Sequence, residues 1–397
     1  LDGATRKASV YLLHRNEGRE RAEGKLLSAE DADEVKKLSG MDAVFSVEML
    51  AEHLARAART AGKQLFTPFQ PAEGFAMSRD LAIRAVADYT NDPWDQTASR
   101  EGSFMLKLRT RFPQFELRDL SPTLDQLRLI KSAAELAMIR KATHLACAAI
   151  LEAMKSVKPG QYEHELDGLA KFIYYRNGAQ GEAYYSLIAS ARNAWYPHYN
   201  AGKRKMQDGD FLLFDFAPDV GYYMSDITRM MPVNGKFSAG QRELYGFYKD
   251  AYRAILKAIR PGVQVAQIKA EAVKEMEAIL ARAKFSKPIY EQAARNFVSN
   301  YQAGASRGSL GHWVGLSTHD VGSYDGILRA GMVFTIEPAL TVPEEQIYIR
   351  MEDLIIIHDT RAEVVSDYLP MEMDEIEKVM REEGLLKKYP RLQRTEP

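Results

Sequence analysis

Apolar residues recur near the 3.6-residue period of an α-helix in two long segments of the chain. This spacing predicts helices over residues 134–157 and 241–259. Each predicted helix ends before a proline–glycine pair, Pro159-Gly160 in the first case and Pro261-Gly262 in the second, because proline cannot continue a helix. A second helical stretch follows each pair. The two breaks lie 102 residues apart, which hints at two related halves.

Short apolar runs follow each pair of helical stretches and predict strands. The runs cover residues 183–190, 211–217 and 222–233 after the first pair, and residues 332–341 and 347–357 after the second. Each half is therefore predicted to contain two helices followed by antiparallel strands.

The first 120 or so residues show a different order, in which strand-like and helical runs alternate. Residues 10–13 and 115–118 predict strands, and residues 49–61 predict a helix. A break follows at Ser121-Pro122-Thr123. Because 397 residues are too many for one ordinary core, we predict two domains. They are an N-terminal α/β domain over residues 1–122 and a second domain over residues 123–397, and the fold class is α+β.

Four acidic residues lie in or beside the apolar runs of the second domain, where an unpaired charge is unfavourable. They are Asp215, Asp226, Glu337 and Glu352, and too few lysines or arginines lie near them in the sequence to neutralise all four. His312 is a fifth candidate ligand. Four carboxylates and one imidazole suit a pair of divalent cations. The sequence therefore predicts a dinuclear metal site.

The spacing of these acids suggests how they meet. Asp215 ends one predicted strand and Asp226 lies on the next, so a hairpin would bring both carboxylates to a shared ion. Glu337 and Glu352 repeat this arrangement. Arg350 stands two residues before Glu352, hence on the same face of a strand, where it could hold a ligand carboxylate.

Composition excludes several other classes of protein. The formal net charge of −1 argues against a general nucleic-acid or membrane-surface binder. No apolar run approaches the roughly 20 residues that span a bilayer. The one cysteine, Cys147, excludes an intrachain disulfide and a cysteine-based metal cluster, and its place on the apolar side of a predicted helix indicates a core residue. The chain begins at Leu1 without a signal-peptide pattern, which favours a cytoplasmic protein over a processed exported one.

Several short motifs resemble those of one enzyme family. They are His198-Tyr199, Phe214-Asp215-Phe216-Ala217, Ser225-Asp226-Ile227-Thr228-Arg229, Gly311-His312-Trp313-Val314-Gly315, His319-Asp320-Val321-Gly322, Thr335-Ile336-Glu337-Pro338 and Ile349-Arg350-Met351-Glu352. In their order and spacing, residues from about 120 to 385 resemble the metallopeptidases with the pita-bread fold, in particular Xaa-Pro aminopeptidase (aminopeptidase P) and prolidase.

The resemblance implies a set of residue roles. Two divalent ions, Mn²⁺ first and Zn²⁺ or Co²⁺ as alternatives, would be bound between five side chains. By position, Asp215 would bind one ion, His312 and Glu337 the other, and Asp226 and Glu352 would bridge both. A water or hydroxide between the ions would be the nucleophile, with Glu337 as proton acceptor. His198 and His319 would line the substrate pocket, and Arg350 would support a ligand carboxylate.

The resemblance also implies an activity, namely hydrolysis of the bond between an N-terminal residue and a following proline. A prolidase-type Xaa-Pro dipeptidase is the near alternative. A non-catalytic binding module on the same fold and a metal-independent creatine amidinohydrolase are disfavoured, because all five ligand positions are intact. The expected partners are peptides with proline at the second position, in a homodimer or higher homo-oligomer, without nucleic acid or membrane.

Two departures from the family pattern have consequences. Proline-specific members usually have a histidine four residues before the ligand histidine, where this chain has Gly308. One imidazole fewer in the pocket predicts modest cleavage of Xaa-Pro peptides or a shifted substrate preference. The resemblance to the creatinase-like N-terminal domain begins part way through that domain, near residues 9–13, and so implies that this domain is incomplete.

Overall fold

The computed structural model describes residues 1–59, 62–303, 310–323 and 325–389. By their internal contacts the residues form two compact units, which are discontinuous in sequence. Unit 1 comprises Leu1–Phe69 and Gln96–Ser121, and unit 2 comprises Gln70–Asp95 and Pro122–Pro397. A domain division between residues 122 and 123 stays a prediction. In the structure, the segment 70–95 packs with unit 2.

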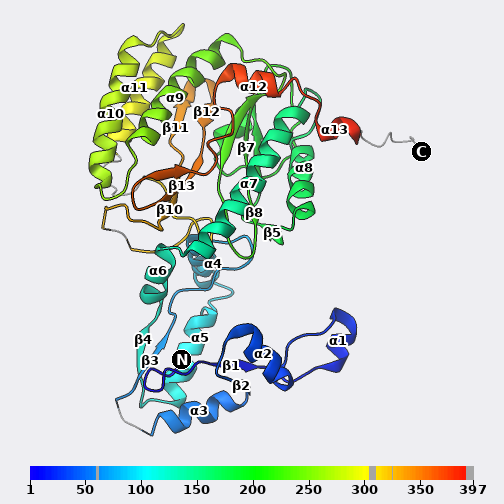
Figure 1. Cartoon of the computed structure of the whole chain (residues 1–397), viewed down its shortest axis with the longest axis vertical. Coiled ribbons are helices and arrows are strands. Elements are labelled where there is room, and N and C mark those ends of the chain that lie inside the picture. Colours follow the sequence, from blue (N-terminus) through cyan, green and yellow to red (C-terminus); the bar gives the residue numbers. More distant parts are fainter. Residues whose placement is uncertain (60–61, 304–309, 324, 390–397) are drawn as a thin grey trace, which may run out of the picture. The chain divides into compact units, whose positions relative to one another are not determined.

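Unit 1 has the predicted alternation of strands and helices (Figure 1). β1 (Ser9–Leu12) pairs in parallel with β2 (Ala43–Ser46), and β3 (Gln64–Thr67) pairs in parallel with β4 (Glu116–Asp119). Its helices are α1 (Glu17–Glu23), α2 (Ala32–Ser39), α3 (Met49–Ala57) and α5 (Arg100–Arg111). The helix predicted to run to residue 61 ends earlier, because the chain tightens after Ala57, where Arg59 donates to the Arg56 carbonyl.

Unit 2 contains the two predicted helix–helix–strand arrays. The first consists of α7 (Ala133–Ser156), α8 (Glu163–Arg176), β5 (Gly181–Glu182), β6 (Leu187–Ser190), the short helix η2 (Ala191–Trp195), β7 (Phe211–Asp215), β8 (Pro218–Asp219) and β9 (Thr228–Pro232). The second consists of α9 (Ala239–Ala258), α10 (Val265–Arg282), α11 (Pro288–Ala303), β10 (Val333–Ile336), β11 (Ala339–Val342), β12 (Ile347–Arg350), β13 (Asp353–Ile357) and β14 (Ala362–Val364). Helix α11 was not predicted. The remaining α-helices of the described residues are α4 (Arg79–Asn91), α6 (Ser121–Leu129), α12 (Met373–Val379) and α13 (Leu385–Lys388).

The strands of the two arrays meet in the middle of unit 2. β6, β7 and β9 form one antiparallel sheet and β10, β13 and β14 another, while β11 and β12 form a hairpin. Thr228 and Glu352 exchange backbone hydrogen bonds of 3.2 and 3.0 Å, which join the first array to the second. In Figure 1 these strands lie between α7 and α8 on one side and α9, α10 and α11 on the other.

Local sequence explains where the long helices begin and which face they bury. At the start of α7, Ser132 and Glu135 form a capping box that satisfies free backbone N–H groups. Ile139, Ile150 and Met154 on the apolar stripe of this helix are fully buried. Cys147 is a buried free thiol among them, which confirms its prediction as a core residue.

The predicted placement on strands is wrong for three of the four acids. Asp226 precedes β9, because the chain between residues 220 and 223 makes a tight turn and antiparallel pairing resumes only at Thr228. Glu337 follows β10, and Glu352 lies between β12 and β13. Only Asp215 belongs to a strand, as its last residue. Side chains at the ends of different strands can point toward one place, whereas successive side chains within a strand point to opposite faces of the sheet.

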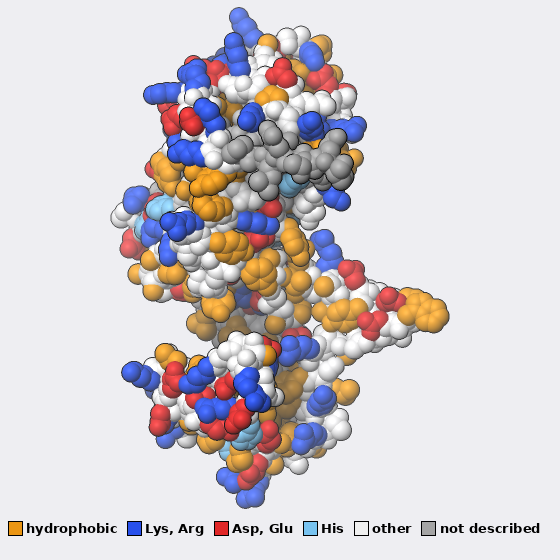
Figure 2. Space-filling view, turned by 90° about the vertical axis from the view of Figure 1, so that its right-hand side faces the viewer, with side chains coloured by type: hydrophobic (Ala, Val, Ile, Leu, Met, Phe, Trp, Pro, Cys, Tyr) orange, Lys and Arg blue, Asp and Glu red, His pale blue; other side chains and the backbone are white. Residues whose placement is uncertain are grey.

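The surface carries both signs of charge. Figure 2 shows lysines and arginines interspersed with aspartates and glutamates on the face it presents. Among the described helices, none is long and apolar enough to cross a membrane.

Candidate metal centre

One cavity of unit 2, with a volume of about 330 Å³, is lined by all eight residues predicted for the metal site and the substrate pocket. Its lining includes the five candidate ligands and three further predicted residues. They are Asp215, Asp226, His312, Glu337 and Glu352, together with His198, His319 and Arg350. Among these predicted residues, His198 and Glu352 lie 154 positions apart in the chain and nevertheless meet at one place.

The ligand atoms lie close enough to share cations. Three groups each have their potential ligand atoms within 4.8 Å of one another: Asp215, Asp226 and Glu352; His312, Glu337 and Glu352; and Asp226, His312 and His319. Glu352 is common to the first two groups. The arrangement can therefore accommodate two neighbouring cations with a shared carboxylate, which is the geometry of a dinuclear site.

Two hydroxyl groups that the sequence analysis missed orient these carboxylates. The Tyr184 hydroxyl lies 2.5 Å from Asp215 Oδ1 and 2.7 Å from Asp226 Oδ1. Thr228 Oγ1 donates to Glu352 Oε2 over 2.8 Å. The sequence signals were slight, since Tyr184 lies in a run predicted as a strand and Thr228 lies two residues after a candidate ligand.

Arg350 is the buried cation of the centre. Its guanidinium contacts Asp215 Oδ2 and lies 3.0 Å from Glu337 Oε2. One arginine cannot neutralise four carboxylates in a buried site. The protein alone therefore leaves excess negative charge at this place.

The pKa values of two acids reflect their burial and this excess of negative charge. Burial, aided by Asp226, raises the pKa of Asp215 to about 7 although Arg350 acts to lower it. Burial and the neighbouring acids raise the pKa of Glu352 well above its usual range. Within the described residues, Glu352 Oε1 is buried and has no hydrogen-bond partner. A divalent cation would satisfy this oxygen, and the oxygen-rich donor set suits a hard ion, so the residues fit a metal centre.

His312 is held with one ring nitrogen toward the acids. Its Nδ1 lies 3.1 Å from the Trp313 carbonyl oxygen, to which it can donate, and its Nε2 lies 3.1 Å from Glu337 Oε1. This orientation leaves Nε2 available as a ligand atom. Gly311 allows the backbone to approach here, because a Cβ at that position would lie 1.9 Å from the Thr335 carbonyl oxygen.

The two other predicted histidines lie in different settings. The ring of His319 lies beside that of His312, with centroids 4.1 Å apart and planes inclined at 46°, and its Nδ1 lies 3.4 Å from Asp80 Oδ2. Burial and His312 lower the pKa of His319, which favours the neutral ring. His198 is exposed at the cavity and follows η2.

The segment that holds His198 is fixed by a buried carboxylate. Glu163 accepts hydrogen bonds from the Ser190 amide over 2.7 Å and from the Tyr199 hydroxyl over 2.9 Å, so it braces both ends of the segment. Gly308, whose position the family comparison singled out, lies outside the described residues.

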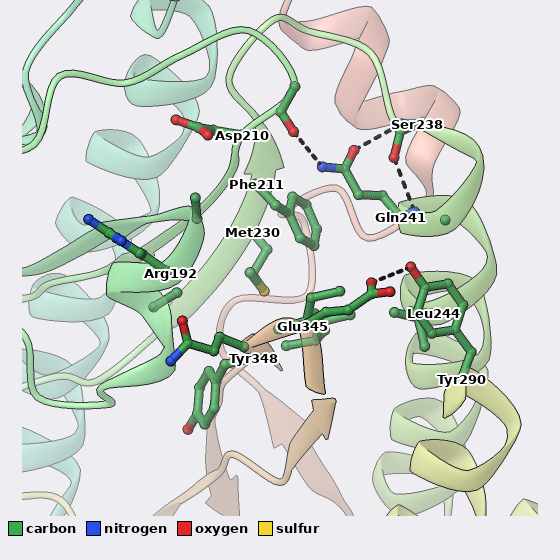
Figure 3. A pocket seen from close by; sticks show the side chains of 17 residues that line it. Arg192, Asp210, Phe211, Met230, Ser238, Gln241, Leu244, Tyr290, Glu345 and Tyr348 are labelled. Carbon is green, nitrogen blue, oxygen red and sulfur yellow. Dashed lines mark hydrogen bonds between the residues drawn. The ribbon is translucent and has the colours of Figure 1, made fainter. Parts of the chain in front are cut away.

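A second cavity, of about 260 Å³, has a different character (Figure 3). Its polar side chains are largely paired with one another and with the backbone. Gln241 donates to the Gly209 carbonyl over 3.1 Å, and the Tyr290 hydroxyl donates to Glu345 over 2.9 Å. Among the described residues, no potential metal-binding group includes a side chain of this cavity. The chemistry therefore concentrates at the first cavity.

The raised pKa values predict that metal binding depends on pH. Without metal, the carboxyl of Asp215 has a pKa of about 7 and holds a proton below that pH. Although burial acts to lower it, the pKa of His312 is also raised well above its usual range by the hydrogen bonds and charges of Asp226 and Glu337. A cation must therefore displace protons from Asp215, Glu352 and His312, so the apparent affinity for Mn²⁺ should increase as pH rises from about 5 through 7. Calorimetric titration in buffers of different ionisation enthalpy would measure both affinity and proton release. An affinity that is constant over this range would contradict the expectation.

Comparisons with known proteins agree with this geometry. The model of metallopeptidase family M24 matches residues 137–359. Xaa-Pro aminopeptidase of Escherichia coli is 34% identical over 279 residues, which are 66% of this chain and 62% of that protein. Xaa-Pro dipeptidase of Pyrococcus horikoshii is 30% identical over 64% of this chain and 67% of its own length. The solved structure of aminopeptidase P from E. coli in a low-pH form superposes with a TM-score of 0.72, at 26% identity, over 94% of this chain and 82% of that one.

Proposed function

Because the chain belongs to metallopeptidase family M24, we propose that it is a dinuclear-metal-dependent aminopeptidase that removes an N-terminal residue ahead of proline. One observation carries the proposal: four carboxylates and a histidine converge in a cavity that supplies a single buried arginine for them. The preference for proline rests on similarity to proteins named Xaa-Pro aminopeptidase and Xaa-Pro dipeptidase. The alignment spans less than two thirds of the E. coli aminopeptidase.

The proposed ligand set follows the two groups that share Glu352. Asp215 would hold one ion, and His312 and Glu337 would hold the other. Glu352 would serve both ions, since it belongs to both of these groups, and Asp226 would also serve both, since its carboxylate lies beside Asp215 and 3.5 Å from His312 Nε2. Mn²⁺ is the proposed metal, with Zn²⁺ or Co²⁺ as alternatives.

The chain's own residues have distinct parts in the proposed hydrolysis. Bound divalent ions supply a nucleophile from water at neutral pH and polarise the scissile carbonyl. Glu337 accepts the proton of the attacking water and passes it to the departing amine of proline. His198 and His319 contact the peptide near the scissile bond and stabilise the negative charge that develops there. Arg350 holds Asp215 and Glu337 in place.

The assay that tests the function uses the manganese-loaded protein and a tripeptide such as alanyl-prolyl-leucine. We expect release of free alanine, loss of activity on chelation, and recovery on addition of Mn²⁺. Activity that persists after complete chelation of the metal would contradict the metal-dependent mechanism. Cleavage of peptides regardless of the second residue would contradict the preference for proline.

Loss of either pocket histidine should slow the reaction without emptying the metal site. We expect His198→Ala and His319→Ala each to lower kcat/KM by about 10²–10³-fold, the usual effect of removing one donor to a developing negative charge. Metal content, measured by elemental analysis, should stay at two ions. His144→Ala is a control, since that histidine lies on α7 outside the cavity. Full activity of both pocket variants would contradict the assigned roles.

The second candidate is a prolidase-type dipeptidase, favoured by the similarity to the P. horikoshii Xaa-Pro dipeptidase. The same assay distinguishes the two, because a dipeptidase cleaves alanyl-proline and leaves alanyl-prolyl-leucine intact. A non-catalytic binding module is disfavoured by the convergence of all five candidate ligands. Assembly into a homodimer or higher homo-oligomer and a cytoplasmic location stay predictions.

A further inference from the structure

Helix α4 forms part of the wall of the catalytic cavity, although it lies far from the other lining residues in sequence. Asp80, Leu81 and Arg84 of this helix line the cavity. Residues four positions apart lie on the same face of a helix, so Asp80 and Arg84 are neighbours there. Helix α4 therefore presents one carboxylate and one guanidinium to the substrate space.

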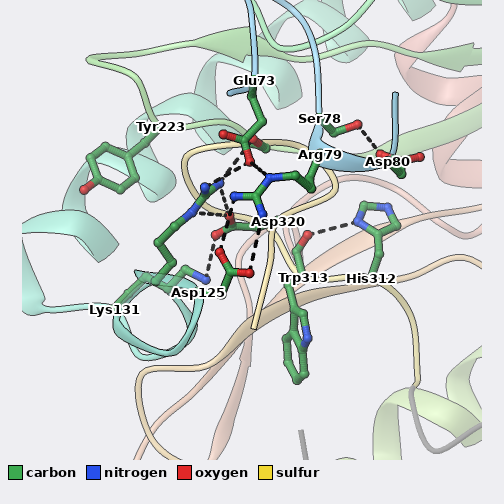
Figure 4. A network of polar contacts seen from close by, with 12 residues as sticks. Glu73, Ser78, Arg79, Asp80, Asp125, Lys131, Tyr223, His312, Trp313 and Asp320 are labelled. Atoms are coloured by element: carbon green, nitrogen blue, oxygen red, sulfur yellow. Dashed lines mark hydrogen bonds and ion pairs between the residues drawn. The ribbon is translucent and has the colours of Figure 1, made fainter. Parts of the chain in front are cut away.

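A network of ion pairs holds the start of α4 (Figure 4). Arg79 Nε and Arg128 NH1 donate to the same oxygen of Glu73, over 2.9 and 3.0 Å. Arg128 Nε also donates to Asp320 Oδ1 over 2.9 Å. Asp320 follows His319 directly in the chain, so this network joins α4 to the loop that carries a pocket histidine. These ion pairs therefore attach helix α4 to the site.

The two charges on α4 differ in how they are used. Asp80 accepts a hydrogen bond from Ser78 Oγ over 2.5 Å and faces His319. Arg84 is exposed and forms no hydrogen bond or ion pair with any residue in the described ranges. The cavity's other arginine, Arg350, is engaged by Asp215 and Glu337. Arg84 is therefore available to an anion that enters from solution.

We propose that Arg84 binds the free C-terminal carboxylate of a short peptide substrate. A guanidinium recognises a carboxylate through two parallel hydrogen bonds. The acids of the metal centre would repel the carboxylate of the substrate at their end of the cavity. A cavity of about 330 Å³ is at the small end for ligand sites, which suits peptides of about two or three residues. This inference rests on the proposed function and names its substrate class.

The test compares alanyl-prolyl-leucine with its C-terminal amide, which differs only in the terminal charge. For the unaltered protein we expect kcat/KM to be about 10- to 100-fold higher for the acid, as is typical of a charge-assisted hydrogen bond. Arg84→Met should lower kcat/KM for the acid by the same factor through a higher KM, with kcat kept, because such an interaction binds ground state and transition state alike. The amide should be unaffected.

A charge reversal and a matched control sharpen the test. Arg84→Glu should cleave the acid more slowly than the amide. Arg176→Met should behave as the unaltered protein, since Arg176 is an exposed arginine in the last turn of α8, also unpaired among the described residues and outside the cavity lining. Inhibition by prolyl-leucine and by its amide gives a second readout, and we expect Arg84→Met to weaken only the former.

The outcomes separate this inference from the proposed function. If the unaltered protein cleaves both peptides equally well, and Arg84→Met changes neither rate, the carboxylate role is overturned while the peptidase activity stands. If the manganese-loaded protein cleaves neither peptide, the proposed function fails and the inference falls with it.

Discussion

Glu352→Gln is expected to lower kcat/KM by more than the loss of a single transition-state donor does, and that loss typically costs about 10²–10³-fold. It should also reduce the bound metal from two ions to one or none. Glu352 belongs to two of the three groups of potential ligand atoms, and its Oε1 has no hydrogen-bond partner in the described residues. An amide keeps the shape of the side chain but removes the charge, so both cations lose a shared ligand.

Metal content by elemental analysis and Mn²⁺ affinity by calorimetry would measure this effect beside the peptidase rate. Glu344→Gln is the matched control, because Glu344 is an exposed acid in the turn between β11 and β12. Asp226→Asn should resemble Glu352→Gln if both residues bridge. Two ions and full activity in either bridging variant would disprove the ligand assignment.

The second large effect concerns stability, where Asp353→Ala is expected to decrease the free energy of unfolding by about 3–5 kcal/mol. The side chains of Arg229 and Asp353 are fully buried and paired at 2.6 Å. Tyr252 and Ser366 also donate to Asp353. Removal of the carboxylate leaves a buried guanidinium without its counter-charge, and a buried unpaired charge is strongly unfavourable.

Urea unfolding of the metal-free protein would isolate this effect, because Asp353 adjoins Glu352 and its loss would also disturb metal binding. Glu291→Gln provides the control, since Glu291 pairs with Arg295 on the same helix while their side chains are 50% and 58% exposed. A partly exposed pair contributes at most about 1 kcal/mol. Equal destabilisation by the two variants would contradict the argument from burial.

The periodicity of apolar residues was enough to predict the long helices. α7 spans residues 133–156 and α9 spans residues 239–258, each within two residues of the prediction. The order of helices before strands in the two arrays was also predicted, except for α11. Such features are local, because a helix buries one stripe whose spacing depends on neighbours in sequence alone. The identity of the candidate ligands was also readable, since four acids next to apolar runs need compensation.

The boundaries of the strands were less predictable, and so were the positions of the acids relative to the strand ends. The expected strand over residues 222–233 shrank to β9 (Thr228–Pro232), and Asp226 fell outside it. Pairing partners decide where a strand starts, and the partner of β9 is β7 (Phe211–Asp215). The backbone link between Thr228 and Glu352 joins residues 124 positions apart, which no local pattern contains.

The sequence by itself determined the two helix–helix–strand arrays and the candidate metal ligands, because helical periodicity and buried charge leave local signatures. The tertiary structure alone decided how those ligands are completed. It brought the hydroxyl of Tyr184 between two carboxylates, and it placed Asp80 and Arg84 from α4 in the wall of the same cavity. Exposed polar residues on a short helix have no distinguishing pattern of their own. Their role arises only when packing sets them against side chains distant in the chain, and packing depends on the whole fold.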